Sequence, residues 1–208
     1  MSMGRPNLIG RIAQAPPRLR ARIAGLFYLL NVLMGGFAAA VAGRLVVYGD
    51  AAILAAAACY VVVTLLFYGL FKPVDRNISG LAALFSLVGC AVSALSVFHL
   101  ALYNVSSLPF FGLYCLLIGY LILRSTFLPR VLGVLMAFAG FGWLTFVSPS
   151  LVNTVSPYNM IPGVLAEGLL TLWLLVMGVN SQRWKEQAAA SMPATGRLPA
   201  NGRQISRT

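Results

Sequence analysis

Acidic residues are scarce in this sequence, and charge of either sign is low. The 208 residues include 4 Asp or Glu residues, and all charged residues together make up 9% of the chain. A soluble domain usually carries about 25% charged residues. Apolar and aromatic residues make up 60%, and the mean hydropathy is +0.87. No water-soluble fold buries that much apolar surface, so the bilayer must solvate most of the chain.

Histidine and cysteine are also rare, which excludes several kinds of site. One histidine cannot supply a multi-histidine metal centre, and the 3 cysteines lie inside apolar runs without the spacing of a zinc site or a disulfide framework. The sequence has no Walker loop, dinucleotide-binding loop or serine-centred nucleophile elbow. We therefore expect no metal and no cofactor. We also expect that the protein is not an enzyme, and an intramembrane enzyme ranks a distant third behind the two functions given below.

Long apolar runs dominate what is present. About 20 apolar residues in a helix cross a hydrocarbon core about 30 Å thick. Six runs meet or approach that length: 23–42, 51–71, 78–103, 108–123, 131–147 and 161–179. They predict an all-α membrane protein, a bundle of about six transmembrane helices occupying residues 22–181.

Basic residues are distributed asymmetrically around these runs. All but one of the 15 Lys and Arg residues lie in the two terminal segments or in the turns after the second and fourth runs. The exception is Arg44, in the first loop of the other side. The positive-inside rule then predicts that both termini are cytoplasmic. The placement of basic residues on the cytoplasmic side of the membrane therefore accounts for the net charge of +11, and we expect no nucleic-acid partner.

The first run has an alternative interpretation as a cleavable signal peptide, because Ala40-Val41-Ala42 follows a basic arm and an apolar stretch. The stretch is longer than a usual signal core, and cleavage would leave five spans.

Residues 1–21 and 182–208 are basic and rich in small or polar residues. We expect them to be a disordered arm and a disordered tail in the cytoplasm, attracted to anionic lipid headgroups.

Glycine spacing predicts one close helix contact. Gly112 and Gly119 lie seven residues apart in the fourth run, and Gly133 and Gly140 repeat that spacing in the fifth. Each pair therefore shares one face of its helix, and a short turn joins the two runs. We expect an antiparallel pair whose glycine faces meet.

Polar side chains inside spans are the first place to look for function, because they are costly in lipid. Glu167 is the one carboxylate well inside a span, His99 and Asn104 lie at the outer end of the third run, and Asn31 lies near the middle of the first. A hydrogen bond between Glu167 and His99 would form either a structural clasp or a ligand- or proton-binding site.

Two functions follow from these residues. The first is binding or transport of a small apolar or amphipathic molecule through an outward-facing cavity near Glu167 and His99. The second is a structural or regulatory protein that associates with another membrane protein, or with a second copy of itself, through its helix faces.

Several stretches resemble a known family. The strongest is Phe110-Phe111-Gly112-Leu113-Tyr114-Cys115-Leu116-Leu117-Ile118-Gly119-Tyr120-Leu121-Ile122, followed by Leu123-Arg124-Ser125 and Phe127-Leu128-Pro129-Arg130-Val131-Leu132-Gly133. Shorter matches are Arg22–Leu30, Lys72–Asn77 and Pro162–Gly168. Together they resemble the bacterial membrane proteins grouped as domain of unknown function (DUF) 4386.

The resemblance implies a multi-span protein of the bacterial cytoplasmic (inner) membrane and carries no assigned activity. This sequence departs from the family pattern in having compact loops. It also has Ser106-Ser107-Leu108-Pro109 where the family often has a His-Gly motif, so no role of that motif carries over.

Overall fold

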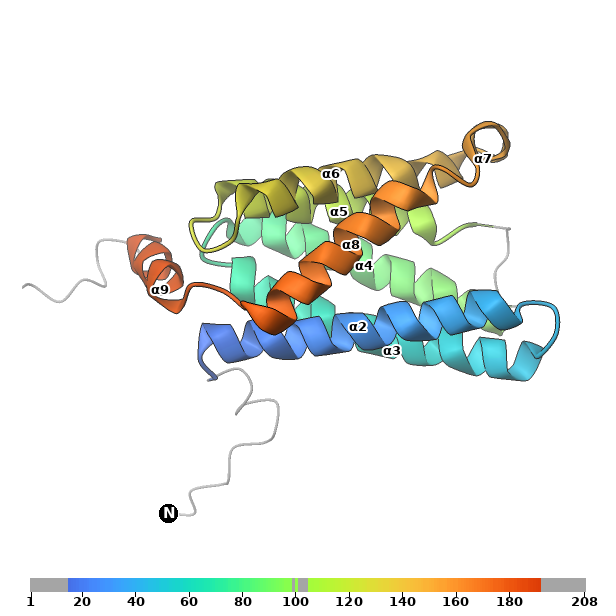
Figure 1. Cartoon of the computed structure of the whole chain (residues 1–208), viewed down its shortest axis with the longest axis horizontal. Helices are drawn as coiled ribbons and strands as arrows, with labels where there is room; N and C mark the ends of the chain where they lie inside the picture. Colours follow the sequence, from blue (N-terminus) through green and yellow to red (C-terminus); the bar gives the residue numbers. More distant parts are fainter. Residues whose placement is uncertain (1–14, 99, 101–104, 192–208) are drawn as a thin grey trace, which may run out of the picture.

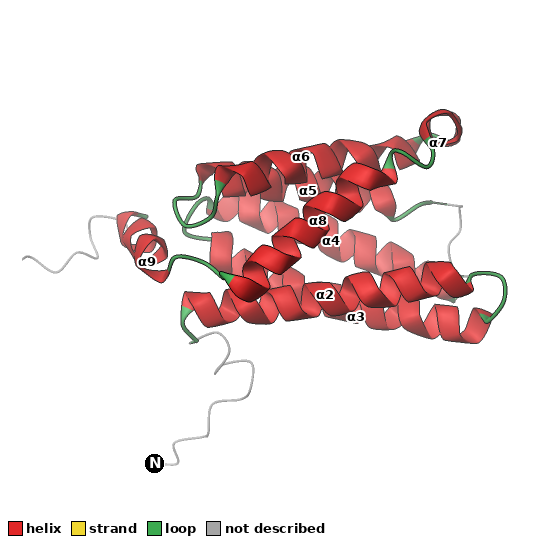
Figure 2. Cartoon of the chain, in the orientation of Figure 1, coloured by secondary structure: helices red, strands yellow, loops and turns green. Residues whose placement is uncertain are grey.

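The computed structural model describes residues 15–98, 100 and 105–191, and within these ranges it contains helices and no strand (Figure 2). The elements are α2 (Pro17–Val41), α3 (Val46–Phe71), α4 (Arg76–Val97), α5 (Leu108–Arg124), α6 (Arg130–Leu144), the 3-10 turn η1 (Thr145–Val147), α7 (Pro149–Val155), α8 (Met160–Val176) and α9 (Ser181–Ala190). This confirms the predicted all-α membrane fold.

The apolar helices differ in whether each is long enough to cross a membrane by itself. By length and apolar composition, four helices can each cross a membrane: α2, α3, α4 and the Arg130–Val147 segment formed by α6 and η1. The pair of α7 and α8, bent by 82°, passes the same test as one broken span. The apolar helix α5 has 17 residues, which lies at the lower limit for a span. Each of the six predicted runs thus contains a helix.

The six apolar helices form a closed ring. Each packs against its neighbour along the chain, from α2 through α3, α4 and α5 to α6. Helix α8 contacts both α6 and α2 and so closes the ring, running obliquely across these two helices (Figure 1). Up-down connections keep neighbouring helices antiparallel. The resulting core contains the largest buried side chains, among them Tyr28, Tyr114, Phe67 and Met136.

The glycines predicted to pack together meet between α5 and α6. A Cβ atom on Gly119 would lie 2.7 Å from the Gly133 carbonyl oxygen, and one on Gly140 would lie 2.8 Å from the Gly112 carbonyl oxygen. The two backbones therefore touch at both levels of the pair. Because these faces are buried inside the chain, they are not available to a partner protein.

The ends of several helices follow ordinary capping rules. The Asp75 side chain accepts hydrogen bonds from the backbone N–H groups of Asn77 and Ile78 at the start of α4. Proline stands in the first turn of α2, α5 and α7, where it removes no helical hydrogen bond. Helix α4 ends at Val97, and residues 99 and 101–103 of the third predicted run lie outside the described residues.

Helix α9 differs from the expected disorder of residues 182–208. Its N-cap residue Asn180 accepts from two backbone N–H groups, and its Trp184 indole donates to the Leu70 carbonyl at 2.8 Å. The Arg20 guanidinium stacks 5.0 Å from the Trp184 ring centre, and Gln187 accepts from Thr126. These contacts with α2, α3 and the α5–α6 turn supply the packing that composition alone does not predict.

Both ends of the described chain lie at one end of the bundle, together with the α3–α4 and α5–α6 turns (Figure 1). We call this the basic end, because the described Lys and Arg residues other than Arg44 lie there: Arg18, Arg20, Arg22, Lys72, Arg76, Arg124, Arg130, Arg183 and Lys185. The opposite end carries the α2–α3 loop and α7, and we use the label outer end for it without reference to a side of the membrane.

Candidate functional site

Glu167 lies in α8, about 10 Å along the helix from its start at Met160. Its side chain is partly buried and accepts two hydrogen bonds from other helices. The Trp143 indole N–H of α6 donates to Oε1 at 2.7 Å, and the Cys115 thiol of α5 donates to the same oxygen at 3.7 Å. Three helices are thus joined at one carboxyl group.

Three tyrosines from three helices surround this carboxyl group. Tyr28 of α2, Tyr60 of α3 and Tyr114 of α5 are almost completely buried. Tyr60 makes edge contacts with the rings of Tyr28 and Tyr114, at centroid distances of 5.5 and 5.6 Å. The Tyr28 hydroxyl lies toward the Glu167 carboxyl. We define the Glu167 cluster as Glu167, Trp143, Cys115, Tyr28, Tyr60 and Tyr114.

Several hydroxyl groups in and beside the cluster are left without partners. The Tyr28 and Tyr114 hydroxyls are buried and form no hydrogen bond within the described chain. The same is true of Thr171, one helical turn beyond Glu167 and only 2% exposed. Buried polar groups are hydrogen-bonded in the great majority of cases, and each unpaired group costs about 1–3 kcal/mol. These three hydroxyls are therefore the buried polar groups beside Glu167 that meet no hydrogen-bond criterion with another described group.

Small residues make room for the Trp143 side chain. Gly163, one turn before Glu167, lies directly against the indole ring, and a Cβ atom there would overlap it. Gly142 packs equally closely on the Asn159 carbonyl at the start of α8. The Asn159 side chain donates to the Thr145 hydroxyl at 2.9 Å, which fixes the outer ends of α6 and α8 together.

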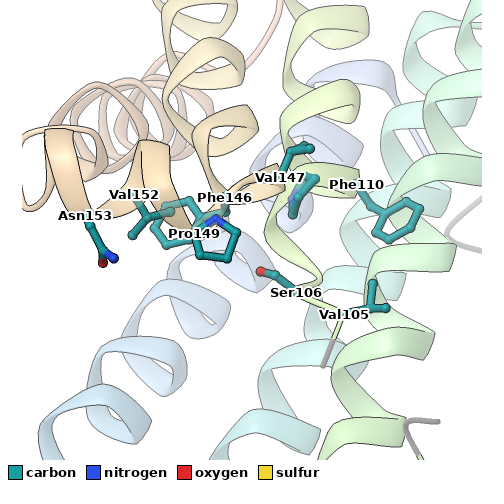
Figure 3. Close-up of a pocket in the computed structure, with 9 residues that line it drawn as sticks. Val105, Ser106, Phe110, Phe146, Val147, Pro149, Val152 and Asn153 are labelled. Atoms are coloured by element: carbon teal, nitrogen blue, oxygen red, sulfur yellow. The ribbon is translucent and has the colours of Figure 1, made fainter. Parts of the chain in front are cut away.

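A cavity of about 560 Å³ opens at the outer end of the bundle (Figure 3). The start of α5, η1 and α7 form its walls, which are mainly apolar: Val105, Ser106, Pro109, Phe110, Phe146, Val147, Pro149, Val152 and Asn153. The ring of Phe146 lies 6.1 Å from that of Trp143. One wall residue of the cavity thus packs against the Glu167 cluster.

The predicted site residues have different outcomes. His99 and Asn104 lie outside the described residues, as does any contact between His99 and Glu167. Asn31 is partly buried on α2, one turn beyond Tyr28, and its side chain bonds to no other described residue. Among the described residues, no group of His, Cys, Asp and Glu is arranged to hold a metal ion.

No motif in the sequence predicted the aromatic part of the cluster, and the cysteine spacing excluded only a zinc site or a disulfide framework. One signal was present: Tyr28, Tyr60 and Tyr114 stand well inside apolar runs, whereas tyrosine in membrane proteins is typical of the headgroup level. A tyrosine hydroxyl deep in a span needs a polar partner. That rule would have indicated a polar centre shared by the first, second and fourth runs.

Comparison with known proteins gives a family and no activity. The family model described as "Domain of unknown function (DUF4386)" matches residues 98–178, which include α5 to α8. An uncharacterized protein of Archaeoglobus fulgidus is 32% identical over 127 residues, covering 57% of this chain and 76% of that protein. No solved structure matches the chain. From the family model and this relative, the chain belongs to the DUF4386 family of multi-pass membrane proteins.

Proposed function

We propose that the protein binds a small amphipathic molecule inside the membrane and carries it across, with Glu167 as the polar anchor. The observation that carries this proposal is the set of buried, unpartnered hydroxyls around a carboxyl group at mid-span. A clasp with a purely structural role would be expected to satisfy its own polar groups. A ligand with hydrogen-bonding groups would satisfy them instead.

The outer cavity supports an entrance from outside the cell. Its volume of about 560 Å³ lies within the range of about 300–1,000 Å³ typical of small-molecule pockets. Its walls are mainly apolar, and the wall residue Phe146 packs near Trp143, which donates to Glu167. A ligand therefore reaches the carboxyl group by displacing aromatic side chains rather than by crossing a helix.

The orientation that we propose places the basic end in the cytoplasm of a bacterial cell, at its inner membrane. The positive-inside rule supports this, because the described outer end carries Arg44 as its one basic residue. At the basic end, a cavity of about 380 Å³ lies between Arg18, Trp173 and Ser181. Its position suits an anionic lipid headgroup, with the phosphate on the Arg18 guanidinium.

This orientation predicts opposite labelling of two exposed positions. In a variant without native cysteines, Ser150→Cys in α7 should react with a membrane-impermeant maleimide in intact cells. Asn77→Cys at the start of α4 should react only after the cells are permeabilised. The reverse pattern would place the basic end outside and contradict the proposed direction of entry.

Water access to the Glu167 cluster tests the proposed function itself. Cys115 is completely buried and bonded to Glu167, so it reports on the site without a new substitution. In a Cys59→Ser, Cys90→Ala background, a small membrane-impermeant methanethiosulfonate added outside should modify Cys115 slowly, as the ring opens outward. The labelling of Cys115 should saturate with time, because every molecule passes through the state in which the ring is open to the outside.

A matched variant that retains only Cys59 provides the control. Cys59 lies on α3 next to Tyr60, and its side chain is partly exposed, unlike the buried Cys115. If Cys115 is protected as fully as Cys59 in correctly inserted protein, the cluster is a dry structural clasp. The alternative function, association with another membrane protein or a second copy, would then be favoured.

We also propose a non-enzymatic role. The cluster combines one carboxyl group with aromatic rings, hydroxyls and a thiol. The three other acidic residues, Asp50, Asp75 and Glu186, lie toward the ends of the bundle or in α9. A paired carboxylate for acid–base chemistry is therefore not in reach of Glu167.

A further inference from the structure

We infer that the ligand of the Glu167 cluster is a lipophilic organic cation, which exchanges with a proton on the Glu167 carboxyl group. This inference rests on the function proposed above and names its substrate class. It depends on the charge of the site and on the rings that surround it.

The charge balance of the described spans favours a cation. Glu167 is the one carboxylic acid deep in a described span, and the described Lys and Arg side chains lie at the two ends of the bundle. An isolated ionised carboxylate in a low-dielectric interior costs several kcal/mol. Glu167 is therefore stable in two forms: with a proton attached, or ionised and paired with a cation from outside the described chain.

The surrounding rings favour a cation that is organic rather than an inorganic ion. Tyr28, Tyr60 and Tyr114 lie around the carboxyl group, and Phe111 extends this wall at 4.9 Å from the Tyr60 ring centre. Aromatic faces attract ammonium-type cations, and the attraction strengthens when the site is dry. Inorganic ions prefer several oxygen ligands in a regular shell, which one carboxyl group does not supply.

The exchange keeps the charge of the site constant. When the cation arrives, the O–H bond of the Glu167 carboxyl group breaks, the proton leaves to water, and the carboxylate pairs with the cation. Trp143 has no other ionisation state near neutral pH and donates its N–H to Oε1 in both forms. The other titratable groups of the cluster are Cys115 and Tyr114 of α5, Tyr28 of α2 and Tyr60 of α3, with Cys90 of α4 near Tyr114.

The test measures binding of charged and uncharged probes to the full chain in lipid nanodiscs. Tetraphenylphosphonium and benzyltrimethylammonium are the cations, and triphenylphosphine oxide is an uncharged analogue. At least one cation should bind more tightly than the oxide, with an affinity that rises with pH because protons compete for Glu167. A weakly buffered pH dye should detect one proton released per bound cation.

Substitutions separate the carboxyl group from general effects. Glu167→Gln should weaken cation binding by about ten-fold or more and remove its pH dependence. Glu167→Asp keeps the carboxyl group and should keep the pH dependence, which guards against a misfolded Gln variant. Glu186→Gln makes the same chemical change at an exposed position of α9 and should bind like the unmodified protein.

The outcomes distinguish this inference from the function on which it rests. If the oxide binds as tightly as either cation, without proton release, the ligand is not a cation although the site binds small molecules. If no probe binds and Cys115 is protected from water-soluble reagents, both the inference and the proposed function are wrong.

Discussion

Gly119→Ala should lower the free energy of unfolding by about 1–3 kcal/mol, even though it adds one methyl group to a helix. The new Cβ atom would lie 2.7 Å from the Gly133 carbonyl oxygen and 3.0 Å from the Ala137 backbone nitrogen. Both neighbours belong to the backbone of α6, so no side chain can rotate away. The helices α5 and α6 must separate, which loses contacts along the whole pair. Unfolding in mixed micelles with increasing sodium dodecyl sulfate measures the loss.

Two further variants make this prediction specific. Gly133→Ala should cost about as much, and the double variant should cost less than both losses together, because one separation of the helices relieves both overlaps. Gly35→Ala, in the last third of α2, adds its methyl group where nothing lies within 4 Å. It should be neutral or stabilising, since alanine favours helix by about 1 kcal/mol. Equal losses at positions 35 and 119 would contradict the close packing of α5 and α6.

Gly163→Ala should have the second large effect, by removing Trp143 from Glu167. The added Cβ atom would occupy part of the space that the indole ring fills, so the ring must move. Its N–H then leaves Oε1, and a buried carboxyl group loses its shortest hydrogen bond. Overpacking and the lost bond together should lower stability by about 2–5 kcal/mol. Cation binding should weaken as well, because the carboxyl group is no longer held in place.

Gly168→Ala is the matched control, on the same helix and one residue after Glu167. Nothing lies within 4 Å of its added Cβ atom, so stability and binding should stay close to those of the unmodified protein. Trp143→Phe removes the N–H donor while keeping an aromatic ring, and it should reproduce the effect on binding with a smaller loss of stability. If Gly163→Ala behaves like Gly168→Ala, Trp143 is not held by this contact.

The sequence predicted those parts of the fold that depend on solvent and local spacing. Each apolar run became a helix, because backbone groups in lipid must bond within their own segment. The seven-residue glycine spacing indicated which faces of α5 and α6 can approach. Neither argument needs any knowledge of which distant helices meet.

The parts that the sequence did not predict depend on tertiary contacts. Trp143 resembles any other aromatic residue of an apolar run, and nothing in the local sequence indicates that α6 and α2 both reach α8. Helix α9 has a polar composition that predicts disorder, and it forms because Trp184 and Gln187 find partners at the basic end. Glu167 was singled out by its cost in lipid, but the groups that surround it come from four other helices.

Because α8 closes the ring, the bundle cannot be completed until this late helix has been made. Helix α2 leaves the ribosome first, yet Gly25 on its inner face packs on Leu174 and Leu175, more than a hundred residues later. Until α8 has been inserted, α2 and α6 present an open seam to lipid and to insertion factors. A chain interrupted before α8 keeps that seam exposed. Closure of the described bundle therefore depends on the insertion of α8.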